Sequence, residues 1–596
     1  MQFSALHRVT PFLLLIVVAG FSHKAAANHS DRGYDYVNVP PVEWAPCFQD
    51  FGPFECAIYQ VPLKHSKKSK YFYVNGYEPG IDLALIRLPA SDQANKIGSL
   101  FLNPGGPGGS GVSFVLNAAN LLYTPEVRAR FDMVGVDPRG IGQSTGLSCY
   151  TSFDHLDEFF ALQPFPQTVD EIFQQIRFDK SLRKNCKRNA GPILDHMTTA
   201  DTARDMDILR EAVGDKGLTY AGYSYGSFLG VTYANLFPKR VRALIVDAVL
   251  DPISWTTGRR FDKGLPVSTR VRSDAGAQDT LGEYFRLCDT AGVPRCAFAG
   301  NSSERFAALV EKLKAEPVTI VFPDGSELVV DNALLISATL NTLYNPFAWF
   351  LLANDLAFVE QLATTTTLSS NFSVFGTELG RMPNPDLVPQ TIEGFPGVLC
   401  SDSDNPDNPF VWAFAGEISE RKFGYFGKPW TWASSPCAKW PGSKKSRYAG
   451  PFTRKTANTV LVTSTVYDPA TRYEGAVTVD KLLPDSHLLT VEGWGHTTLL
   501  LSDCATQIGA DYLLHGTLPG RTSTCRQDFP PFFLDPGEVF GASAAASAQG
   551  LEAETQSLES SAEADAAAVS NRDAVAAERA EIMRAIMDSR STYGKR

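Results

Sequence analysis

The stretch LTYAGYSYGSFLGVTYA, residues 218–234, decides the fold of this 596-residue chain. It begins with a short apolar run typical of a β-strand and continues in a helical pattern. Between the two, GYSYG at residues 222–226 fits the G-x-S-x-G pattern of a sharp strand-to-helix turn that exposes a serine hydroxyl above a sheet. Glycines on both sides of the serine let the strand and the helix approach closely. The stretch therefore predicts Ser224 as a nucleophile.

A second match, GQSTG at residues 142–146, shows that the pattern alone is weak. Ser144 is separated by a loop from the strand-like run at residues 131–136, and no helical pattern begins at it. We therefore expect the nucleophile to be Ser224 rather than Ser144.

Short apolar runs typical of buried strands recur along the chain, and helical patterns lie between them. Such runs predict an α/β fold with a mostly parallel sheet that is covered on both faces. Residues 252–429 interrupt the series with a helical, loop-rich stretch. We interpret this stretch as a cap over the carboxyl edge of the sheet. An independent second domain is the alternative, and it is disfavoured because the later strands need the same sheet.

A serine nucleophile needs a base that takes its proton and an acid that orients the base. His496 follows a strand-like run near the end of the chain, where the base stands in a Ser-Asp-His order. Asp468 follows the strand-like run before that one and is the expected acid, with Asp480 and Asp485 as nearby alternatives. His487 precedes the same strand as His496, so we expect it at the opposite edge of the sheet.

The glycine-rich stretch NPGGPGGSG, residues 103–111, follows an early strand-like run. Glycines let backbone N–H groups point at a developing oxyanion, so we expect donors at Gly106 and at Tyr225, the residue after the nucleophile. A phosphate cradle is the alternative, but the stretch contains neither G-x-G-x-x-G nor G-K-[ST].

The ends of the chain differ from its middle in composition. Residues 1–27 contain an apolar run and a small-residue site, AAA, which predict a secretory signal peptide; a retained anchor is the alternative. Residues 537–596 are rich in Ala, Ser and Glu and predict a disordered tail. We therefore expect a secreted protein without a stable membrane span. The formal net charge of −11 argues against a nucleic-acid partner.

The ten cysteines fit an oxidising compartment. Zinc ligation is disfavoured, because the sequence contains no C-x-x-C and no cysteine cluster with a histidine at ligand spacing. We expect neither a metal nor a cofactor. Sequons stand at Asn28, Asn301 and Asn371, and the last two are the candidate glycosylation sites. Connectivity is not fixed by spacing, but we expect sequence-local disulfides: Cys47–Cys56, Cys149–Cys186, Cys288–Cys296, Cys400–Cys437 and Cys504–Cys525.

These motifs, together with GVDPRGIGQS (135–144), DAVLDP (247–252), YDPATRYEGA (467–476) and GWGHTTL (493–499), resemble the α/β-hydrolase fold. More narrowly, residues 44–533 resemble the secreted tripeptidyl aminopeptidase-like branch of the proline iminopeptidase family. The resemblance implies a mostly parallel sheet with helices on both faces and an inserted, mainly helical cap. It divides the hydrolase core into residues 28–251 and 430–536, and the second part resembles the family's TAP-like C-terminal module.

The resemblance also implies an activity. Family members remove residues from a free peptide N-terminus through an acyl-enzyme, with Ser224, Asp468 and His496 matching the triad. An exopeptidase needs an anion for the substrate ammonium; Asp402 and Asp251 are the candidates, and a structural carboxylate is the alternative for each. The expected substrate is a peptide or a small acyl compound. A secreted esterase with the same triad and an inactive binding protein are the other hypotheses, and whether one or three residues are released stays open.

Overall fold

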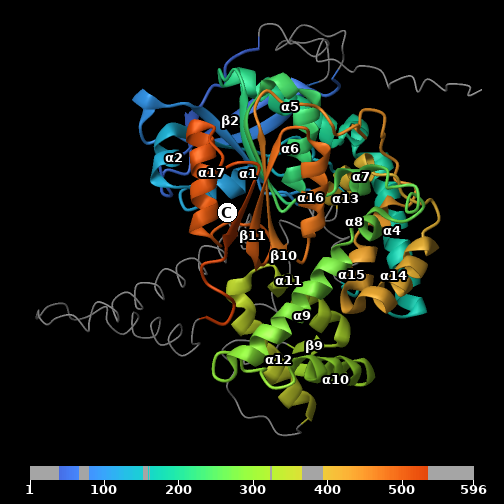
Figure 1. Ribbon diagram of the computed structural model, residues 1–596. Coiled ribbons are helices and arrows are strands. Elements are labelled where there is room, and N and C mark those ends of the chain that lie inside the picture. Colours follow the sequence, from blue (N-terminus) through green and yellow to red (C-terminus); the bar gives the residue numbers. More distant parts are fainter. Residues whose placement is uncertain are drawn as a thin grey trace, which may run out of the picture.

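The structure is a computed structural model that describes residues 39–65, 80–151, 159, 161–322, 325, 327–364 and 393–533 (Figure 1). The signal peptide expected at residues 1–27, the tail at residues 537–596, Asn28 and Asn371 lie outside the described residues. No helix within the described ranges has both the length and the apolar character needed to cross a membrane.

Within the described residues, ten strands form one sheet in the order β1-β2-β3-β5-β4-β6-β7-β10-β11-β12. The first three pair antiparallel, and the seven from β5 to β12 run parallel. The strands are β1 (Ala45–Pro46), β2 (Glu55–Pro62), β3 (Gly80–Leu88), β4 (Gly98–Asn103), β5 (Phe131–Val136), β6 (Leu218–Tyr223), β7 (Val241–Asp247), β10 (Val460–Tyr467), β11 (Ser486–Trp494) and β12 (Thr522–Arg526). The mostly parallel α/β sheet predicted from the apolar runs is confirmed.

Helices cover both faces of this sheet, which explains why its central strands are apolar throughout. Alternate residues of β6 enter two separate cores: Tyr220 packs in one and Ala221 in the other. The first core includes residues from α5 (Thr199–Ala212), α6 (Tyr225–Leu236) and α16 (Tyr473–Leu482). The second includes residues from α1 (Gly111–Ala118), α2 (Pro125–Arg130) and α17 (Asp503–His515). The two groups of helices lie on opposite sides of the strands in Figure 1.

Most of the described chain between β7 and β10 is helical. Its middle part, from α9 to α12, has a core of its own around Tyr284, Phe306 and Trp349, whereas residues of α7, α8 and α13 to α15 pack in the first sheet core. One antiparallel hairpin, β8 (Val318–Val321) with β9 (Glu327–Val330), departs from the helical expectation. In Figure 1 the elements α9 to α12 lie beyond one end of the sheet. The helices are α7 (Pro252–Thr256), α8 (Val267–Val271), α9 (Ser273–Ala291), α10 (Ser302–Ala315), α11 (Asn332–Leu343), α12 (Trp349–Thr364), α13 (Phe395–Asp402), α14 (Phe410–Phe423) and α15 (Gly427–Trp432).

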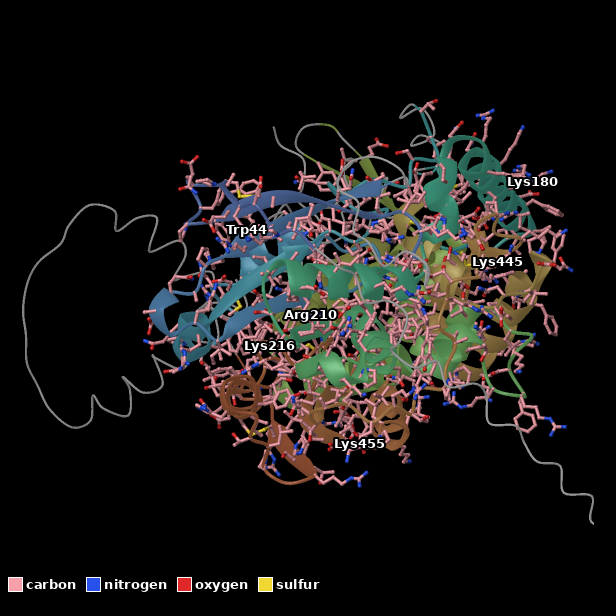
Figure 2. The ribbon with its side chains drawn as sticks, turned by 90° about the horizontal axis from the view of Figure 1, so that it is seen from above. Trp44, Lys180, Arg210, Lys216, Lys445 and Lys455 are labelled. Carbon is pink, nitrogen blue, oxygen red and sulfur yellow. A yellow bond between two sulfur atoms is a disulfide. The ribbon has the colours of Figure 1, made fainter. Side chains whose placement is uncertain are left out.

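A long helix that precedes the nucleophile turn, α4 (Val169–Asn189), joins this helical part: the rings of Phe173 and Phe410 lie 5.7 Å apart. Seen from above, Lys180 of α4 and Trp44 beside β1 lie at opposite ends of the molecule (Figure 2). The strand β10 nevertheless pairs directly with β7, Val460 opposite Leu244, although the whole helical part separates them in the chain. The inserted segment therefore leaves the sheet intact.

Five disulfides join the ten cysteines. Each joins sequence neighbours, as expected: Cys47–Cys56, Cys149–Cys186, Cys288–Cys296, Cys400–Cys437 and Cys504–Cys525.

Candidate active site

Ser224 stands in the turn between β6 and α6, as the G-x-S-x-G pattern predicts. Its backbone has φ 58° and ψ −125°, a region that costs a non-glycine residue free energy. A Cβ at Gly222 would lie 2.3 Å from the carbonyl oxygen of Gly226, and a Cβ at Gly226 would lie 2.7 Å from that of Asn103. Side chains at either position would therefore collide with backbone, and the turn requires both glycines.

The second serine of this pattern has a different environment. Ser144 is buried; its Oγ donates to the carbonyl oxygen of Asp137 at 2.5 Å and accepts the N–H of Ala84 at 2.9 Å. These bonds join the loop after β5 to β3. The pentad at residues 142–146 is therefore a structural turn.

Asp468 and His496 meet at the carboxyl edge of the sheet, where β10 and β11 end. The Nδ1 atom of His496 lies 2.9 Å from each carboxylate oxygen of Asp468, and both side chains are buried. Asp468 also accepts hydrogen bonds from the N–H groups of Ala470 and Thr471 and from the Thr471 hydroxyl, at 2.8, 2.8 and 2.9 Å. Because the carboxylate holds Nδ1, Nε2 is the ring nitrogen that can exchange a proton with a hydroxyl group.

The alternative partners lie elsewhere. At the start of β11, the Nδ1 of His487 bonds the carbonyl oxygen of Gly520 at 2.6 Å and its Nε2 bonds the Ser523 hydroxyl at 2.8 Å. Asp480 accepts the hydroxyl of Ser486 at 2.7 Å. Asp485 accepts that of Thr459 at 2.9 Å. All three lie at the amino end of β10 and β11, opposite Asp468 and His496.

Asp247 connects Ser224 to the loop of His496, a role that the sequence analysis did not predict. It ends β7 beside Tyr223, and its carbonyl oxygen accepts the N–H of Ser224 at 2.9 Å. Its carboxylate accepts the N–H of Thr498 at 2.9 Å and the Thr498 hydroxyl at 2.8 Å. Burial raises the pKa of Asp247 to about 7. Asp247 could have been found from the sequence, because it is a charged residue at the end of a mostly apolar strand-like run.

The helical part reaches the site through Tyr344, which follows α11. Its carbonyl oxygen accepts the N–H of His496 at 2.9 Å, and its ring packs edge-on against the imidazole with 4.9 Å between ring centres. This contact joins residues far apart in the sequence, and no local pattern marks it. The position of His496 is thus set by the sheet and by the helical part together.

The glycine-rich loop packs on the Ser224 turn. Gly105 has φ +94°, and a Cβ there would lie 2.4 Å from the carbonyl oxygen of Tyr223, 2.8 Å from the Ser224 Cβ and 2.9 Å from the Tyr225 nitrogen. Gly106 follows with φ +107°. Tyr225 is the first residue of α6, so its N–H has no acceptor within the helix. The loop thus comes closest to the Ser224 turn at Gly105, the neighbour of the expected donor Gly106, and it lies beside the N–H of Tyr225, the other expected donor.

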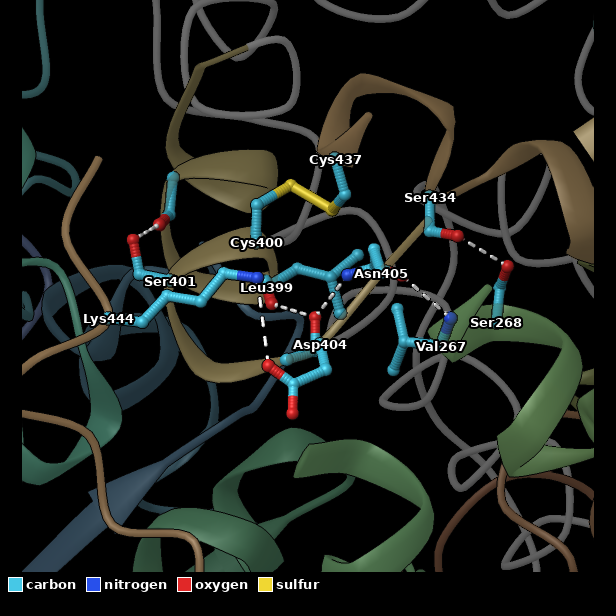
Figure 3. The surroundings of a disulfide bond; sticks show 12 residues. Val267, Ser268, Leu399, Cys400, Ser401, Asp404, Asn405, Ser434, Cys437 and Lys444 are labelled. Atoms are coloured by element: carbon cyan, nitrogen blue, oxygen red, sulfur yellow. Dashed lines mark hydrogen bonds and ion pairs between the residues drawn. A yellow bond between two sulfur atoms is a disulfide. The ribbon is translucent and has the colours of Figure 1, made fainter. Parts of the chain in front are cut away.

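The structure does not support Asp402 as a binding group for a substrate ammonium. Asp402 is buried and accepts the N–H and hydroxyl of Thr199 at 2.9 and 2.5 Å and the indole N–H of Trp255 at 3.4 Å. Burial raises its pKa to about 7. It joins α13 to the start of α5, and the Thr199 hydroxyl in turn bonds that of Tyr225. The disulfide of Cys400 holds the same helix (Figure 3).

Asp251 is likewise occupied. It caps α7, accepting the N–H groups of Ile253 and Ser254 at 3.0 and 3.3 Å, and lies 2.5 Å from Arg259. Helix capping and an ion pair account for this carboxylate. The alternative of a structural carboxylate therefore describes both aspartates.

Comparison with known proteins agrees with the fold. Residues 98–270 match the family described as alpha/beta hydrolase fold, and residues 422–525 match the family described as TAP-like protein. A tripeptidyl aminopeptidase from Streptomyces lividans is 28% identical over 513 residues, which cover 82% of this chain and 87% of that protein.

Two mycobacterial proteins are similar to the same extent. The serine protease Hip1 of Mycobacterium tuberculosis is 30% identical over 505 residues, 81% of this chain and 91% of Hip1. A protein named carboxylesterase B from the same organism is 29% identical over 512 residues, with coverage of 82% and 91%. The fold, the turn around Ser224 and these similarities lead to one conclusion: the chain belongs to the family of α/β hydrolases with a TAP-like module that includes the Streptomyces tripeptidyl aminopeptidase and Hip1.

Proposed function

We propose that the protein is a secreted serine exopeptidase that removes residues from the free N-terminus of peptides. The observation that carries the proposal is the buried Asp468–His496 pair at the sheet edge where the Ser224 turn also lies. Asp247, at the end of β7, bonds both the Ser224 turn and the loop that carries His496. The peptidase names of relatives that match more than four-fifths of the chain support a peptide substrate.

In the proposed reaction His496 takes the proton of Ser224 through Nε2, while Asp468 keeps the proton on Nδ1 and stabilises the imidazolium. The serine Oγ attacks the carbonyl carbon, and the N–H groups of Gly106 and Tyr225 stabilise the resulting oxyanion. His496 then protonates the leaving amine, and the acyl group stays on Ser224. A water molecule, deprotonated by the same imidazole, hydrolyses this ester and restores the serine.

The helical segment at residues 252–429 acts in this proposal as the cap that selects the substrate. Tyr344 brings it into contact with His496, so a peptide that reaches Ser224 must pass between cap and sheet edge. Secretion through the segment at residues 1–27 agrees with five disulfides, which an oxidising compartment allows to form. In that compartment the sequon at Asn301 becomes available for glycosylation.

A second candidate, a secreted ester hydrolase, is favoured by one observation: a relative of equal similarity carries the name carboxylesterase B. An ester hydrolase would use the same three residues, because peptides and esters pass through the same tetrahedral intermediate. The two candidates differ in the substrate alone.

A substrate panel separates them. We expect hydrolysis of peptide anilides with a free N-terminus, such as Ala-Ala-Pro- and Pro-anilide, and little hydrolysis of N-blocked forms. Equal cleavage of blocked and free peptides would contradict exopeptidase activity, and turnover of short nitrophenyl esters alone would favour the esterase. Ser224→Ala should abolish turnover and labelling by a fluorophosphonate. Ser144→Ala should retain labelling, because that hydroxyl is held between Asp137 and Ala84.

A further inference from the structure

A cavity of about 490 Å³ lies between α14, the connection from α7 to α8 and the start of α16. Its volume lies within the range of sites that hold small molecules. Among the described residues that line it, Ser224, His496, Gly106 and Tyr225 are absent, so the cavity is separate from the proposed acyl site. The proposed peptidase reaction leaves it without a role.

One wall of the cavity is an apolar stripe on the outer side of α14. Phe414 and Ile418 line the cavity at four-residue spacing, and their side chains are 68% and 44% exposed. Phe410, one turn earlier, packs against Phe173 instead. The side of the same helix that carries Trp412 and Gly416 is buried. A surface helix normally carries polar residues on its solvent side. The exposed apolar side chains of α14 therefore indicate a surface that binds another molecule.

Neighbouring elements carry further apolar side chains. Leu265, in the connection between α7 and α8, also lines the cavity. Phe261, in the same connection, is 96% exposed. Exposed apolar side chains gathered beside a cavity are typical of binding sites in soluble proteins.

The charges around the cavity have the opposite sign to the chain as a whole. Five basic residues and three acidic residues line it, whereas the whole chain carries a formal charge of −11. Three of the basic residues are compensated by ion pairs: Arg259 with Asp251, Arg272 with Asp274, and Arg472 with Glu474.

Two further basic residues give the lining its excess of positive charge. Arg270 donates to the backbone carbonyls of Ser254, Leu265 and Asp404, so its charge meets dipoles rather than a bonded carboxylate. Lys422 follows Ile418 by one turn of α14 and lies at the rim with its ammonium 5.1 Å from the ring of Phe423. An anion at the mouth of the cavity would find Lys422 beside the apolar stripe.

We propose that this cavity binds an amphipathic anion, a medium-length alkyl chain with a carboxylate or sulfate head group. The alkyl chain packs against Phe414, Ile418 and Leu265, and the head group lies near Lys422. Apolar contact supplies most of the affinity, because most of the basic side chains already have partners. A small inorganic anion would gain no such contact, and a peptide would leave its backbone N–H groups without acceptors on an apolar wall.

The cavity lies close to Asp468, the proposed acid, but none of the three proposed catalytic residues is among the described residues that line it. Thr471 lines it and also donates two hydrogen bonds to Asp468. Blocking the acyl site should nevertheless leave the ligand site free, because Ser224 and His496 are not among the described lining residues.

The test measures binding of dodecanoate to the full-length protein by calorimetry, with displacement of anilinonaphthalene sulfonate as a second readout. The protein is first treated with a fluorophosphonate, so that hydrolysis and acyl-site binding do not contribute. We expect dodecanoate to bind this blocked protein. The double variant Phe414→Ser and Ile418→Ser should weaken binding by about tenfold or more, as expected when a few methylene groups lose their contacts. Phe51→Ser, which changes an equally exposed phenylalanine outside the cavity, should have no effect.

The charge is tested separately. Lys422→Glu should weaken dodecanoate about tenfold and leave the neutral dodecanol unchanged, whereas Lys481→Glu on α16 should change neither. Loss of binding after fluorophosphonate treatment would place the ligand in the acyl site and overturn the proposal. Equal binding by the wild type and the double variant would overturn it as well. Neither result depends on whether the enzyme proves to be a peptidase or an esterase.

Discussion

The carboxylate of Asp247 accepts both the backbone N–H and the hydroxyl of Thr498, at 2.9 and 2.8 Å. Asp247 ends β7 and Thr498 lies in the loop after β11, and β10 lies between these two strands in the sheet. Since the carbonyl group of Asp247 also holds the N–H of Ser224, one residue sets the distance between the serine turn and the histidine loop. A reacting pair that must align within a fraction of an ångström depends on such a connection.

Removing this connection should slow the reaction more than it weakens substrate binding. We expect Asp247→Ala to lower kcat by about ten- to a hundredfold with little change in KM, because His496 loses its alignment while the helical segment between β7 and β10 is untouched. Steady-state kinetics on a peptide anilide measures the effect. Thr498→Val supplies the control for the mechanism: if Asp247 acts through Thr498, the double variant should be no slower than Asp247→Ala alone. Additive losses would contradict the connection.

The glycine at position 105 offers a test of the proposed oxyanion loop with a matched control. Gly105→Ala places a Cβ 2.4 Å from the Tyr223 carbonyl oxygen and 2.8 Å from the Ser224 Cβ, so the loop or the turn must move. We expect roughly a hundredfold loss of kcat, the size of effect found when one oxyanion donor is lost. Gly214 has a similar positive φ of +86°, and a Cβ added there would have no atom within 4 Å. Gly214→Ala should therefore retain activity while the free energy of unfolding falls by about 1 kcal/mol. Similar kinetics for the two variants would exclude a special role of the loop.

The pairing of Asp468 with His496 predicts a large effect from an isosteric change. Asp468→Asn replaces an oxygen beside the histidine Nδ1 with an N–H₂ group, which favours the wrong tautomer of the imidazole. We expect kcat to fall by roughly three to four orders of magnitude with the fold retained, as judged by circular dichroism. Asp480→Asn, which alters a carboxylate bonded to Ser486 at the opposite end of the sheet, should remain active. A fall of less than tenfold for Asp468→Asn would mean that another group orients His496.

The buried carboxyl of Asp402 predicts a pH dependence of stability. Burial raises its pKa from 3.8 to about 7, so the native state binds the proton more tightly than the unfolded chain does. Stability from this residue is therefore greatest at acidic pH and is lost as the pH rises from about 4 to 7. Asp402→Asn removes this titration.

Thermal unfolding of the wild type and of Asp402→Asn at a series of pH values measures the effect. We expect the advantage in Tm of the wild type to be largest near pH 4 and to shrink as the pH rises to about 7. Asp247 and Glu393, whose pKa values burial also raises to about 7, titrate in both proteins and cancel in the comparison. An advantage that stays constant or grows with pH would contradict the raised pKa.

The sheet, the serine turn and the order of Ser224, Asp468 and His496 could be predicted because each follows from a local pattern: an apolar strand, a glycine pair, a loop after a strand. The roles of Asp247 and Tyr344 could not be predicted. Asp247 acts through a contact with a segment some 250 residues later in the chain, and Tyr344 acts through the packing of the helical segment on the loop of His496. Asp402 illustrates the opposite error, since an acid in a cap segment resembles a binding group until its donors, Thr199 and Trp255, are known.

For the segment at residues 252–429, the sequence predicted only the overall helical character and not the individual elements. The hairpin of β8 and β9 is short and partly exposed, and four-residue strands of this kind have too few alternating positions to stand out in a sequence. The α14 stripe was hidden for a related reason: whether an apolar residue faces a core or the solvent is decided by the neighbouring helices.

The pairing of β7 with β10 has a consequence for biosynthesis. A ribosome delivers Leu244 long before its sheet partner Val460, and the whole helical segment emerges in between. During that interval one edge of β7 lacks its partner and exposes backbone hydrogen-bonding groups that can pair with other chains. The part of the helical segment from α9 to α12 has an apolar core of its own and can begin to pack before the sheet is complete. A nascent chain released before residue 460 would therefore be prone to aggregation, and the serine turn would acquire its partners only in the last stage of synthesis.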